Sequence, residues 1–182
     1  MLLLTFTVGP NRYAIDVARI VELVPRVELR SVPHAPAFLA GLLGYRGNVV
    51  PVIDLCLLLD VAPCRDCLST RIILVRDALD DHNQSRSDQG DASEDIKRSG
   101  PGQVRHSSLL GLVAEHVSDL TYVQPEQVVP APVSLPQVPY LSAVVQTDQG
   151  IVQLIAVEKV RDATLRSSFS FEDTALDSRS VL

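Results

Sequence analysis

The stretch Gly41–Leu55 reads GLLGYRGNVVPVIDL, and the fold of the chain can be worked out from it. Apolar residues run up to Tyr45 and resume at Val49, with a short polar interruption between the two runs. Within that interruption, Gly47 and Asn48 both tolerate the positive φ angles that a tight hairpin turn requires. The stretch therefore predicts two antiparallel strands joined by a short turn.

Apolar runs elsewhere in the chain also indicate strands. Leu4, Phe6 and Val8 alternate with threonines and a Gly-Pro turn follows, so residues 3–17 are expected to form a hairpin. Pro51 cannot donate to a sheet ladder, which favours a sheet edge or a bulge for its strand. Further strands are expected at Val27–Leu29, Val49–Leu55, Thr70–Val75, Leu109–Val113, Asp119–Val123, Tyr140–Val145 and Ile151–Val157, and short helical segments after Asp16, at Leu57–Leu59 and at Glu158–Leu165. The class is therefore all-β with short helices.

A weak internal repeat divides the strands into two sets. The segment that begins Ala14-Ile15-Asp16-Val17 resembles the one that begins Gly111-Leu112-Val113-Ala114, and Phe38–Leu43 resembles Tyr140–Val145. The two elements come in the same order in each half. The repeat predicts two similar small β-barrels joined into one body.

The composition fits one globular domain with an insertion. Of the 182 residues, 46% are hydrophobic but only 4% are aromatic, so the core must consist mainly of Val, Leu, Ile and Ala. Residues 78–107 are rich in Asp, Ser, Gln and Gly, a composition that predicts a disordered acidic insertion. We expect a domain over residues 1–165 and a flexible tail over residues 166–182.

The net charge of −6 argues against two classes of partner. An acidic chain without a basic stripe is a poor ligand for nucleic acid and is not attracted to anionic lipid. No apolar run is long enough to cross a bilayer, so no direct membrane insertion is expected. The start of the chain lacks the pattern of an export signal, and the three cysteines are accordingly expected to be reduced thiols in the cytoplasm.

Few residues in the sequence suggest chemistry. Cys64 and Cys67 form a C-x-x-C pair, but zinc needs further ligands at similar spacing, and Cys56 lies too close in the chain to provide a second pair. Asp54 either caps the short helix that follows it or acts as a catalytic acid, and capping is favoured. The histidines, His34, His82, His106 and His116, form no triad order with a nucleophile, so no catalytic residue, cofactor or metal is expected.

Arg46 is the most distinctive polar residue, because it is expected at the exposed tip of the central hairpin. A guanidinium there can make a fork-like contact with a carboxylate of a partner protein. The alternative is a solvated turn arginine without a partner.

Together these segments resemble the CheW family of coupling proteins. The similarity is carried by Tyr13–Val17, Ile20–Leu23, Pro33–Gly41, Gly41–Leu55, Thr70–Ile73 and Leu110–Val113, and it runs in order over about residues 2–165. Gly44 and Tyr45 stand where the family usually has Asn-Leu. This departure, together with Leu68–Ile72, resembles the coupling proteins of Wsp-type surface-sensing systems.

The resemblance implies a fold of two intertwined five-stranded SH3-like barrels. It also implies a cytoplasmic scaffold that docks on the tip of a methyl-accepting receptor and on the regulatory domain of a CheA-type histidine kinase, and that reaches receptor arrays through these partners. Carried over by motif, the partner-binding residues are Glu22, Arg46 and Gly47, with Val21, Gly41 and Asn48 beside them.

Two other functions remain open from the residues themselves. One is a ligand- or redox-sensing β-barrel that uses Cys56, Cys64 and Cys67, and the other is a small hydrolase that uses Asp54 and a histidine. The adaptor is favoured because the unusual exposed residues lie at a hairpin tip and do not form a convergent polar cluster.

Overall fold

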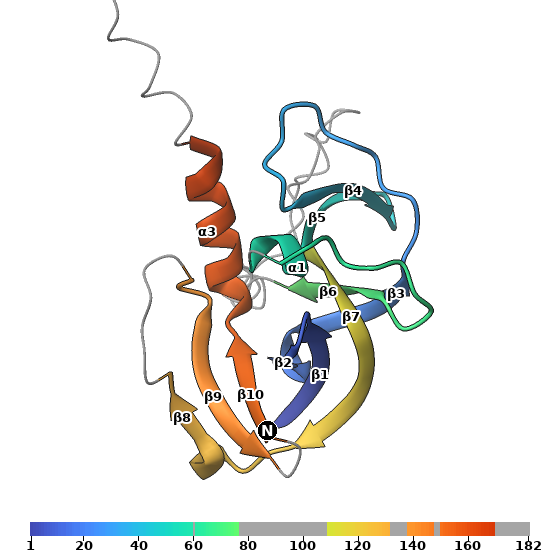
Figure 1. Cartoon of the computed structure of the whole chain (residues 1–182). Coiled ribbons are helices and arrows are strands. Elements are labelled where there is room, and N and C mark those ends of the chain that lie inside the picture. Colours follow the sequence, from blue (N-terminus) through green and yellow to red (C-terminus); the bar gives the residue numbers. More distant parts are fainter. Residues whose placement is uncertain (60, 77–108, 132–137, 148–149, 170–182) are drawn as a thin grey trace, which may run out of the picture.

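The computed structural model describes residues 1–59, 61–76, 109–131, 138–147 and 150–169 (Figure 1). The expected insertion, 78–107, and residues 170–182 of the expected tail lie outside the described residues. Within the described part, strands dominate and the helices are short, which confirms the all-β class. The elements are β1 (Leu2–Val8), β2 (Asn11–Asp16), η1 (Val17–Arg19), β3 (Ile20–Pro25), β4 (Leu39–Tyr45), β5 (Asn48–Asp54), α1 (Leu55–Leu58), β6 (Arg71–Arg76), β7 (Leu109–Tyr122), η3 (Pro125–Gln127), β8 (Val128–Pro130), β9 (Leu141–Thr147), β10 (Gly150–Ile155) and α3 (Val157–Phe169).

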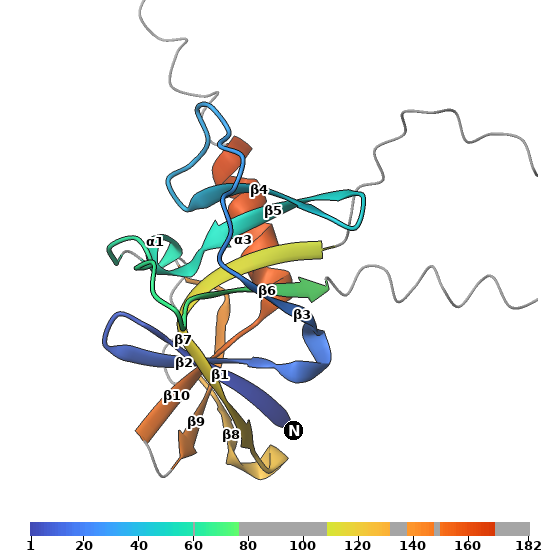
Figure 2. The ribbon, with the colours of Figure 1, turned by 90° about the vertical axis from the view of Figure 1, so that its right-hand side faces the viewer.

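The strands form two curved sets that share β7 (Figures 1 and 2). In the first set the order is β4-β5-β7-β6-β3, with β5 and β7 parallel and the other neighbours antiparallel. In the second set the order is β7-β1-β2-β10-β9-β8, with β2 and β10 parallel. The two copies of the expected internal repeat are exchanged between the sets: β4 of the first copy lies with β7 of the second copy in the first set, and β2 of the first copy lies with β9 of the second copy in the second set.

Strand β7 differs from the sequence-based expectation. Two strands were predicted, with a turn at His116, but one strand runs through both sets. His116 has a φ of 48°, and the pairing with β1 shifts register here, since Thr5 pairs with Asp119 and Thr7 with Glu115. A β-bulge of this kind bends a strand without ending it. The residues that resemble a turn in the sequence therefore do not interrupt β7.

The β1–β2 hairpin lies between two hydrophobic cores. Phe6 and Ile15 belong to the larger core, whereas Leu3 and Ala14 face the smaller core. Thr5, also in β1, is only 3% exposed and donates its hydroxyl hydrogen bond to the Asp119 carbonyl. The hairpin therefore separates the two halves while contributing apolar side chains to both.

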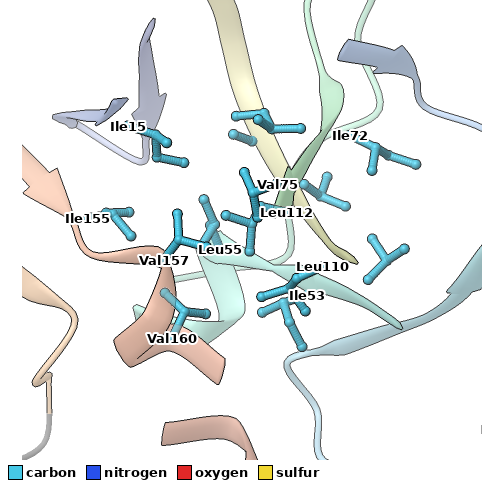
Figure 3. Packing of buried hydrophobic residues seen from close by; sticks show 14 of the residues in the cluster. Ile15, Ile53, Leu55, Ile72, Val75, Leu110, Leu112, Ile155, Val157 and Val160 are labelled. Carbon is cyan, nitrogen blue, oxygen red and sulfur yellow. The ribbon is translucent and has the colours of Figure 1, made fainter. Parts of the chain in front are cut away.

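Helix α3 closes one side of the larger core (Figures 1 and 3). Its Val157 and Val160 are buried and lie beside Leu55 of α1 in the packing. The Tyr140 hydroxyl donates to the Leu58 carbonyl at 2.8 Å and so ties the start of β9 to α1. Helix α3 extends beyond Leu165, where the sequence pattern placed its end.

The chain between β2 and β4 also departs in part from expectation. The Asp16 carboxylate accepts from the Ala18 N–H and caps η1, as predicted, but the helical turn was expected to run through Leu23 and ends at Arg19, just before β3 begins. The following strand is β3, however, and Val27–Leu29 form no strand. Beyond them, Arg30 exchanges two backbone hydrogen bonds with Leu42 of β4, at 2.9 and 3.0 Å. This bridge joins the chain that follows β3 to the free edge of β4 and draws the first sheet toward closure.

Pro51, which has no backbone N–H to donate, lies at a sheet edge on one side of β5. Strand β5 pairs with β4 along its length, but its ladder with β7 begins only at Val52. At Pro51 the β7 side of the strand is therefore still an edge. The expectation of an edge position holds for this residue but not for the whole strand, which is central from Val52 to Asp54.

Candidate functional site: the β4–β5 hairpin tip and the cysteine loop

The hairpin between β4 and β5 turns on Arg46 and Gly47. Their φ angles are 48° and 79°, and positive φ at both central residues is the mark of the tight turn whose twist matches a β-hairpin. The sequence assigned positive φ to Gly47 and Asn48. The structure instead pairs Asn48 with Tyr45 as the first residue of β5, so the turn is one residue earlier than predicted.

An arginine is an unfavourable residue at the first central position of this turn. Side chains other than Gly, Asn and Asp lose roughly 1–2 kcal/mol in the left-handed region. Asn-Gly or Gly-Gly would form the same turn without this cost. Local conformational preference therefore does not explain why residue 46 is an arginine.

The Arg46 side chain belongs to a three-residue group, called here the Glu22–Tyr45–Arg46 cluster. Arg46 Nη2 donates to Glu22 Oε2 at 2.9 Å, and the Tyr45 hydroxyl donates to the same oxygen. The guanidinium carbon lies 5.0 Å from the centre of the Tyr45 ring, a cation–π distance. The cluster thus joins the hairpin tip to β3 and fixes the direction of an otherwise flexible side chain.

The charges of the cluster remain open to solvent. The side chains of Arg46 and Glu22 are 73% and 41% exposed. The hydrogen bond to Glu22 is the main cause that raises the pKa of Tyr45, because an ionised phenol could not donate it. An exposed ion pair contributes little to stability, so its geometry is available for recognition.

Apolar side chains are exposed on the same two elements. Val21 occupies the register shift of β3, between Ile20 and Glu22, and is 36% exposed; Leu23 is 42% exposed and Val49, next to the turn, is 53% exposed. Strand β3 pairs with β6 on one side only, so it is an edge strand among the described residues. Charged, aromatic and apolar groups at a sheet edge are typical of protein-binding surfaces.

Gly41 lies in the interior and is not a surface residue. With a φ of 146°, it has no room for a side chain, because a Cβ would come within 2.7 Å of the Arg30 carbonyl oxygen and 2.9 Å of Leu29 Cβ. It allows the backbone bridge between Arg30 and Leu42 to form. Its contribution to the hairpin is therefore to position β4. Of the other residues of the predicted set, Val21, Arg46 and Gly47 are exposed, and Glu22 and Asn48 are half-buried.

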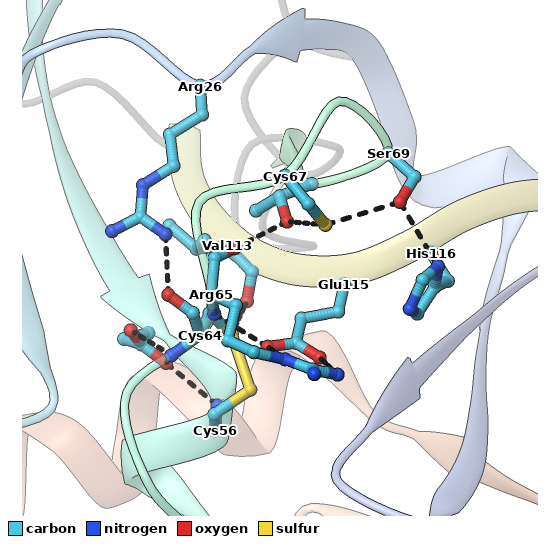
Figure 4. Close-up of polar contacts among 11 residues, drawn as sticks. Arg26, Cys56, Cys64, Arg65, Cys67, Ser69, Val113, Glu115 and His116 are labelled. Carbon is cyan, nitrogen blue, oxygen red and sulfur yellow. Dashed lines mark hydrogen bonds and ion pairs between the residues drawn. A yellow bond between two sulfur atoms is a disulfide. The ribbon is translucent and has the colours of Figure 1, made fainter.

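The cysteines differ from expectation. Cys56 and Cys64 form a disulfide, with Cα atoms 5.4 Å apart, and only Cys67 is a free thiol (Figure 4). The sequence predicted three reduced thiols and singled out Cys64 with Cys67. The pairing was missed because Cys56 lies in α1 and its partner in the loop 61–70, a proximity that only the fold creates. Hydrogen bonds with Ser69 and Thr70 lower the pKa of Cys67.

Asp54 is the anchor of the cysteine loop and is only 3% exposed. Its Oδ1 accepts from the Cys56 N–H at 2.9 Å and from the Leu57 N–H at 3.2 Å, which confirms the predicted helix cap. Its Oδ2 accepts from the Cys64 N–H at 3.1 Å. The atoms of Asp54, Cys56 and Cys64 that could bind a metal ion lie within 4.8 Å of one another. The disulfide, however, removes the thiolate form of cysteine that metals bind.

A second Arg–Glu pair holds the loop at Arg65, the residue that follows Cys64 (Figure 4). Glu115 accepts from the backbone N–H of Arg65 at 2.6 Å, and its other oxygen accepts from Arg65 Nη2 at 3.2 Å. Burial alone would raise the pKa of Glu115, but the hydrogen bonds and charge of Arg65 outweigh it and the pKa is lowered. Sequence reasoning missed this pair because Glu115 lay in the segment interpreted as a turn.

The chain was compared with known proteins. The model of the CheW-like domain matches residues 2–164, nearly the whole chain. The chain belongs to the CheW-like domain family. This confirms the resemblance carried by the central hairpin and the flanking strands.

Curated relatives of the CheW type align over parts of their length. A probable chemotaxis protein CheW of Rhizobium etli is 25% identical over 71% of this chain and 66% of its own length. The chemotaxis protein CheW of Helicobacter pylori is 34% identical over 39% of this chain and 43% of its own length. The chain thus spans less than two thirds of the curated relatives it matches.

A solved structure shows the same CheW-like fold. The scaffolding protein TtCheW of Thermoanaerobacter tengcongensis superposes with a TM-score of 0.64 at 20% identity, over 86% of this chain and 84% of that protein. At this identity the match establishes the fold. Among the described residues, no helix combines the length and apolarity needed to span a membrane.

Proposed function

We propose that this chain is a non-enzymatic coupling protein of a bacterial chemosensory system. It would join the cytoplasmic tip of a methyl-accepting receptor to the regulatory domain of a CheA-type histidine kinase. Membership of the CheW-like family supports the assignment, as do relatives named as chemotaxis proteins and a fold shared with a scaffolding protein. The protein would act in the cytoplasm and reach receptor arrays through its partners.

The observation that carries the proposal is the position of Arg46. It occupies a left-handed turn position that other residues would fill more favourably, and it is held in place by Glu22 and Tyr45. Backbone strain that is retained at an exposed site indicates a function for the side chain. Arg46 and Glu22 would contact the partner, Gly47 and Asn48 would shape the turn, Val21 would add apolar contact, and Gly41 would position β4.

The mechanism of such a coupling protein is geometric. One surface holds the receptor and another holds the kinase, so that a receptor conformation which binds the complex more tightly shifts the kinase equilibrium. The Glu22–Tyr45–Arg46 cluster suits this role because its side chains are already ordered before binding. An ordered contact loses less conformational entropy when a partner docks.

The test is a calorimetric titration of the full chain against the receptor tip and the kinase regulatory domain from the same bacterium. Arg46→Asp should weaken binding to at least one of them by about 2–5 kcal/mol, because it places a like charge against the partner carboxylate. The matched control is Lys159→Asp, which reverses an exposed charge on α3, away from the cluster. Binding unchanged by Arg46→Asp would contradict the assigned surface, and no binding by the parent would contradict the function.

The signalling output is a separate part of the proposal. Gly44 and Tyr45 replace the usual Asn-Leu of the family, and Tyr45 is a member of the cluster. We therefore expect a partner pair of the Wsp surface-sensing type. Deletion of the gene should change biofilm formation and leave swimming motility intact, and the reverse result would assign the chain to chemotaxis.

A further inference from the structure

Cys56 and Cys64 are held together by Asp54 as well as by their disulfide, and the hydrogen bonds of Asp54 do not depend on the sulfur–sulfur bond. The Asp54 carboxylate accepts from the backbone N–H of both cysteines, at 2.9 Å for Cys56 and 3.1 Å for Cys64. One buried carboxylate therefore holds both residues side by side whether or not their sulfur atoms are bonded. Such a support allows the bond to re-form readily after it is broken.

The structure also accommodates the reduced thiol of Cys64. Cys64 Sγ lies 3.6 Å from the Val113 carbonyl oxygen, within reach of a thiol hydrogen bond. A reduced Cys64 would thus donate to a group already beside it, and the loop would lose the covalent link without stranding a buried polar atom. Both oxidation states are therefore compatible with the fold.

The loop that carries Cys64 is linked to the strand with the candidate partner-binding residues. Arg26 Nη1 donates to the Cys64 carbonyl at 2.7 Å (Figure 4). Arg26 directly follows Pro25, the last residue of β3, and β3 carries Val21 and Glu22. A change in the position of Cys64 is thereby passed to the end of an edge strand.

We propose that Cys56 and Cys64 form a reversible redox site, and that its reduction loosens both the loop 61–70 and the end of β3. The reactant is a dithiol. One of its thiolates attacks a sulfur of the disulfide, which gives a mixed disulfide and releases the other cysteine. Its second thiol then displaces the first, and the reactant leaves as a disulfide. Two electrons and two protons are transferred to the protein, and a disulfide oxidant reverses the step.

Burial determines how the site reacts. Cys56 and Cys64 are 1% and 3% exposed, so a reductant reaches them only when the loop opens. The rate of reduction should therefore follow loop opening and saturate as the concentration of dithiol rises. Cys67 lies outside the bonded pair, is more exposed and has a lowered pKa, so a reagent for thiolates reaches it without loop opening and labels it alone in the oxidised protein.

The experiment uses the full chain. Alkylation under denaturing conditions, read by mass spectrometry, should label only Cys67 in protein treated with glutathione disulfide, and all three cysteines after dithiothreitol. Full labelling of protein treated with glutathione disulfide would overturn the proposal. The Cys67→Ser variant is the matched control and should retain the redox response, whereas Cys64→Ser should lose it.

Hydrogen exchange then tests the structural consequence. Reduction should speed exchange at the Val61 and Cys64 amides roughly tenfold or more, with a smaller increase in β3. Exchange in the β9–β10 hairpin serves as the internal reference and should not change. Identical exchange in loop and β3 in both states would overturn the link. Because these measurements involve the chain alone, their outcome is independent of whether the surface binds a receptor or a kinase.

Discussion

Two Arg–Glu pairs in this protein have the same chemistry and different surroundings. The Arg46–Glu22 pair joins the hairpin tip to β3 at 2.9 Å, with a glutamate side chain that is 41% exposed. The Arg65–Glu115 pair joins the cysteine loop to β7 at 3.2 Å, with a glutamate side chain that is only 5% exposed. Burial of the carboxylate is the main difference between them.

That difference separates a recognition role from a structural role. Glu115 also receives a backbone N–H, at 2.6 Å, so removing it leaves an amide without its acceptor. Glu22 receives only side-chain donors, which water can replace. A partner protein can therefore compete for the Arg46–Glu22 pair, whereas the buried carboxylate of Glu115 is already committed to the fold.

The most direct test of whether the two pairs differ in role is to replace each glutamate by alanine. Glu115→Ala should lower the free energy of unfolding by about 3 kcal/mol, because it deprives a partly buried loop of several hydrogen bonds. Glu22→Ala should change it by no more than about 0.5 kcal/mol, as is usual at a surface. Urea denaturation of the two variants measures both values, and equal losses would show that the two pairs do not differ in role.

The hairpin itself provides a second test, with glycines at its base and near its tip. Gly41→Ala should cost about 2 kcal/mol, because its Cβ would lie 2.7 Å from a backbone oxygen at a φ of 146°. Gly44→Ala meets nothing within 4 Å and should be close to neutral. Thermal melts of both variants decide, and a stable Gly41→Ala protein would mean that the Arg30–Leu42 bridge can move.

Much of the fold could be predicted because its signals are local. Alternation in β1, the turn at Gly47 and the cap at Asp54 each depend on a few neighbouring residues. The single β7 strand could not be predicted in this way. Its His116 adopts a turn-like φ, and only pairing with β1 on one side and β6 on the other keeps the strand continuous.

The candidate site was predictable to a similar degree. The motif identified Glu22 and Arg46 separately, but their direct contact and the part played by Tyr45 depend on how β3 approaches the hairpin tip. The Cys56–Cys64 bond depends likewise on the position of the loop 61–70 relative to α1. Contacts between segments that are distant in the chain leave no periodic signal in the sequence.

Acidification tests how much the charge of the buried Glu115 carboxylate contributes to stability. The pKa of Glu115 is lower in the folded state than its ordinary value of 4.5. Its ionised form therefore stabilises the fold at pH values above that ordinary value, and the stabilisation is lost as the pH falls through the lower, folded-state pKa. Urea midpoints of the parent and of Glu115→Gln should differ near neutral pH and converge in acid. If the two midpoints differed by the same amount at every pH, the charge of the Glu115 carboxylate would not account for its contribution to stability.

Arg46→Asn should have a small effect on stability, and of the opposite sign to the losses above. Asparagine tolerates the left-handed region better than arginine does, so the turn should relax, whereas the exposed ion pair that is lost contributes little. The net change should be a gain of about 0.5 kcal/mol in the free energy of unfolding. Urea denaturation measures it, with Lys159→Asn as the control for removing a positive charge elsewhere.

The same variant should bind the partner less tightly, because the guanidinium that reaches the partner carboxylate is gone. A residue whose replacement stabilises the fold and weakens binding is one that is retained for function at some cost to stability. If Arg46→Asn were instead destabilising and binding unchanged, the Glu22–Tyr45–Arg46 cluster would be a support for the hairpin. The two Arg–Glu pairs would then serve the same structural purpose, one with a half-exposed carboxylate and one with a buried carboxylate.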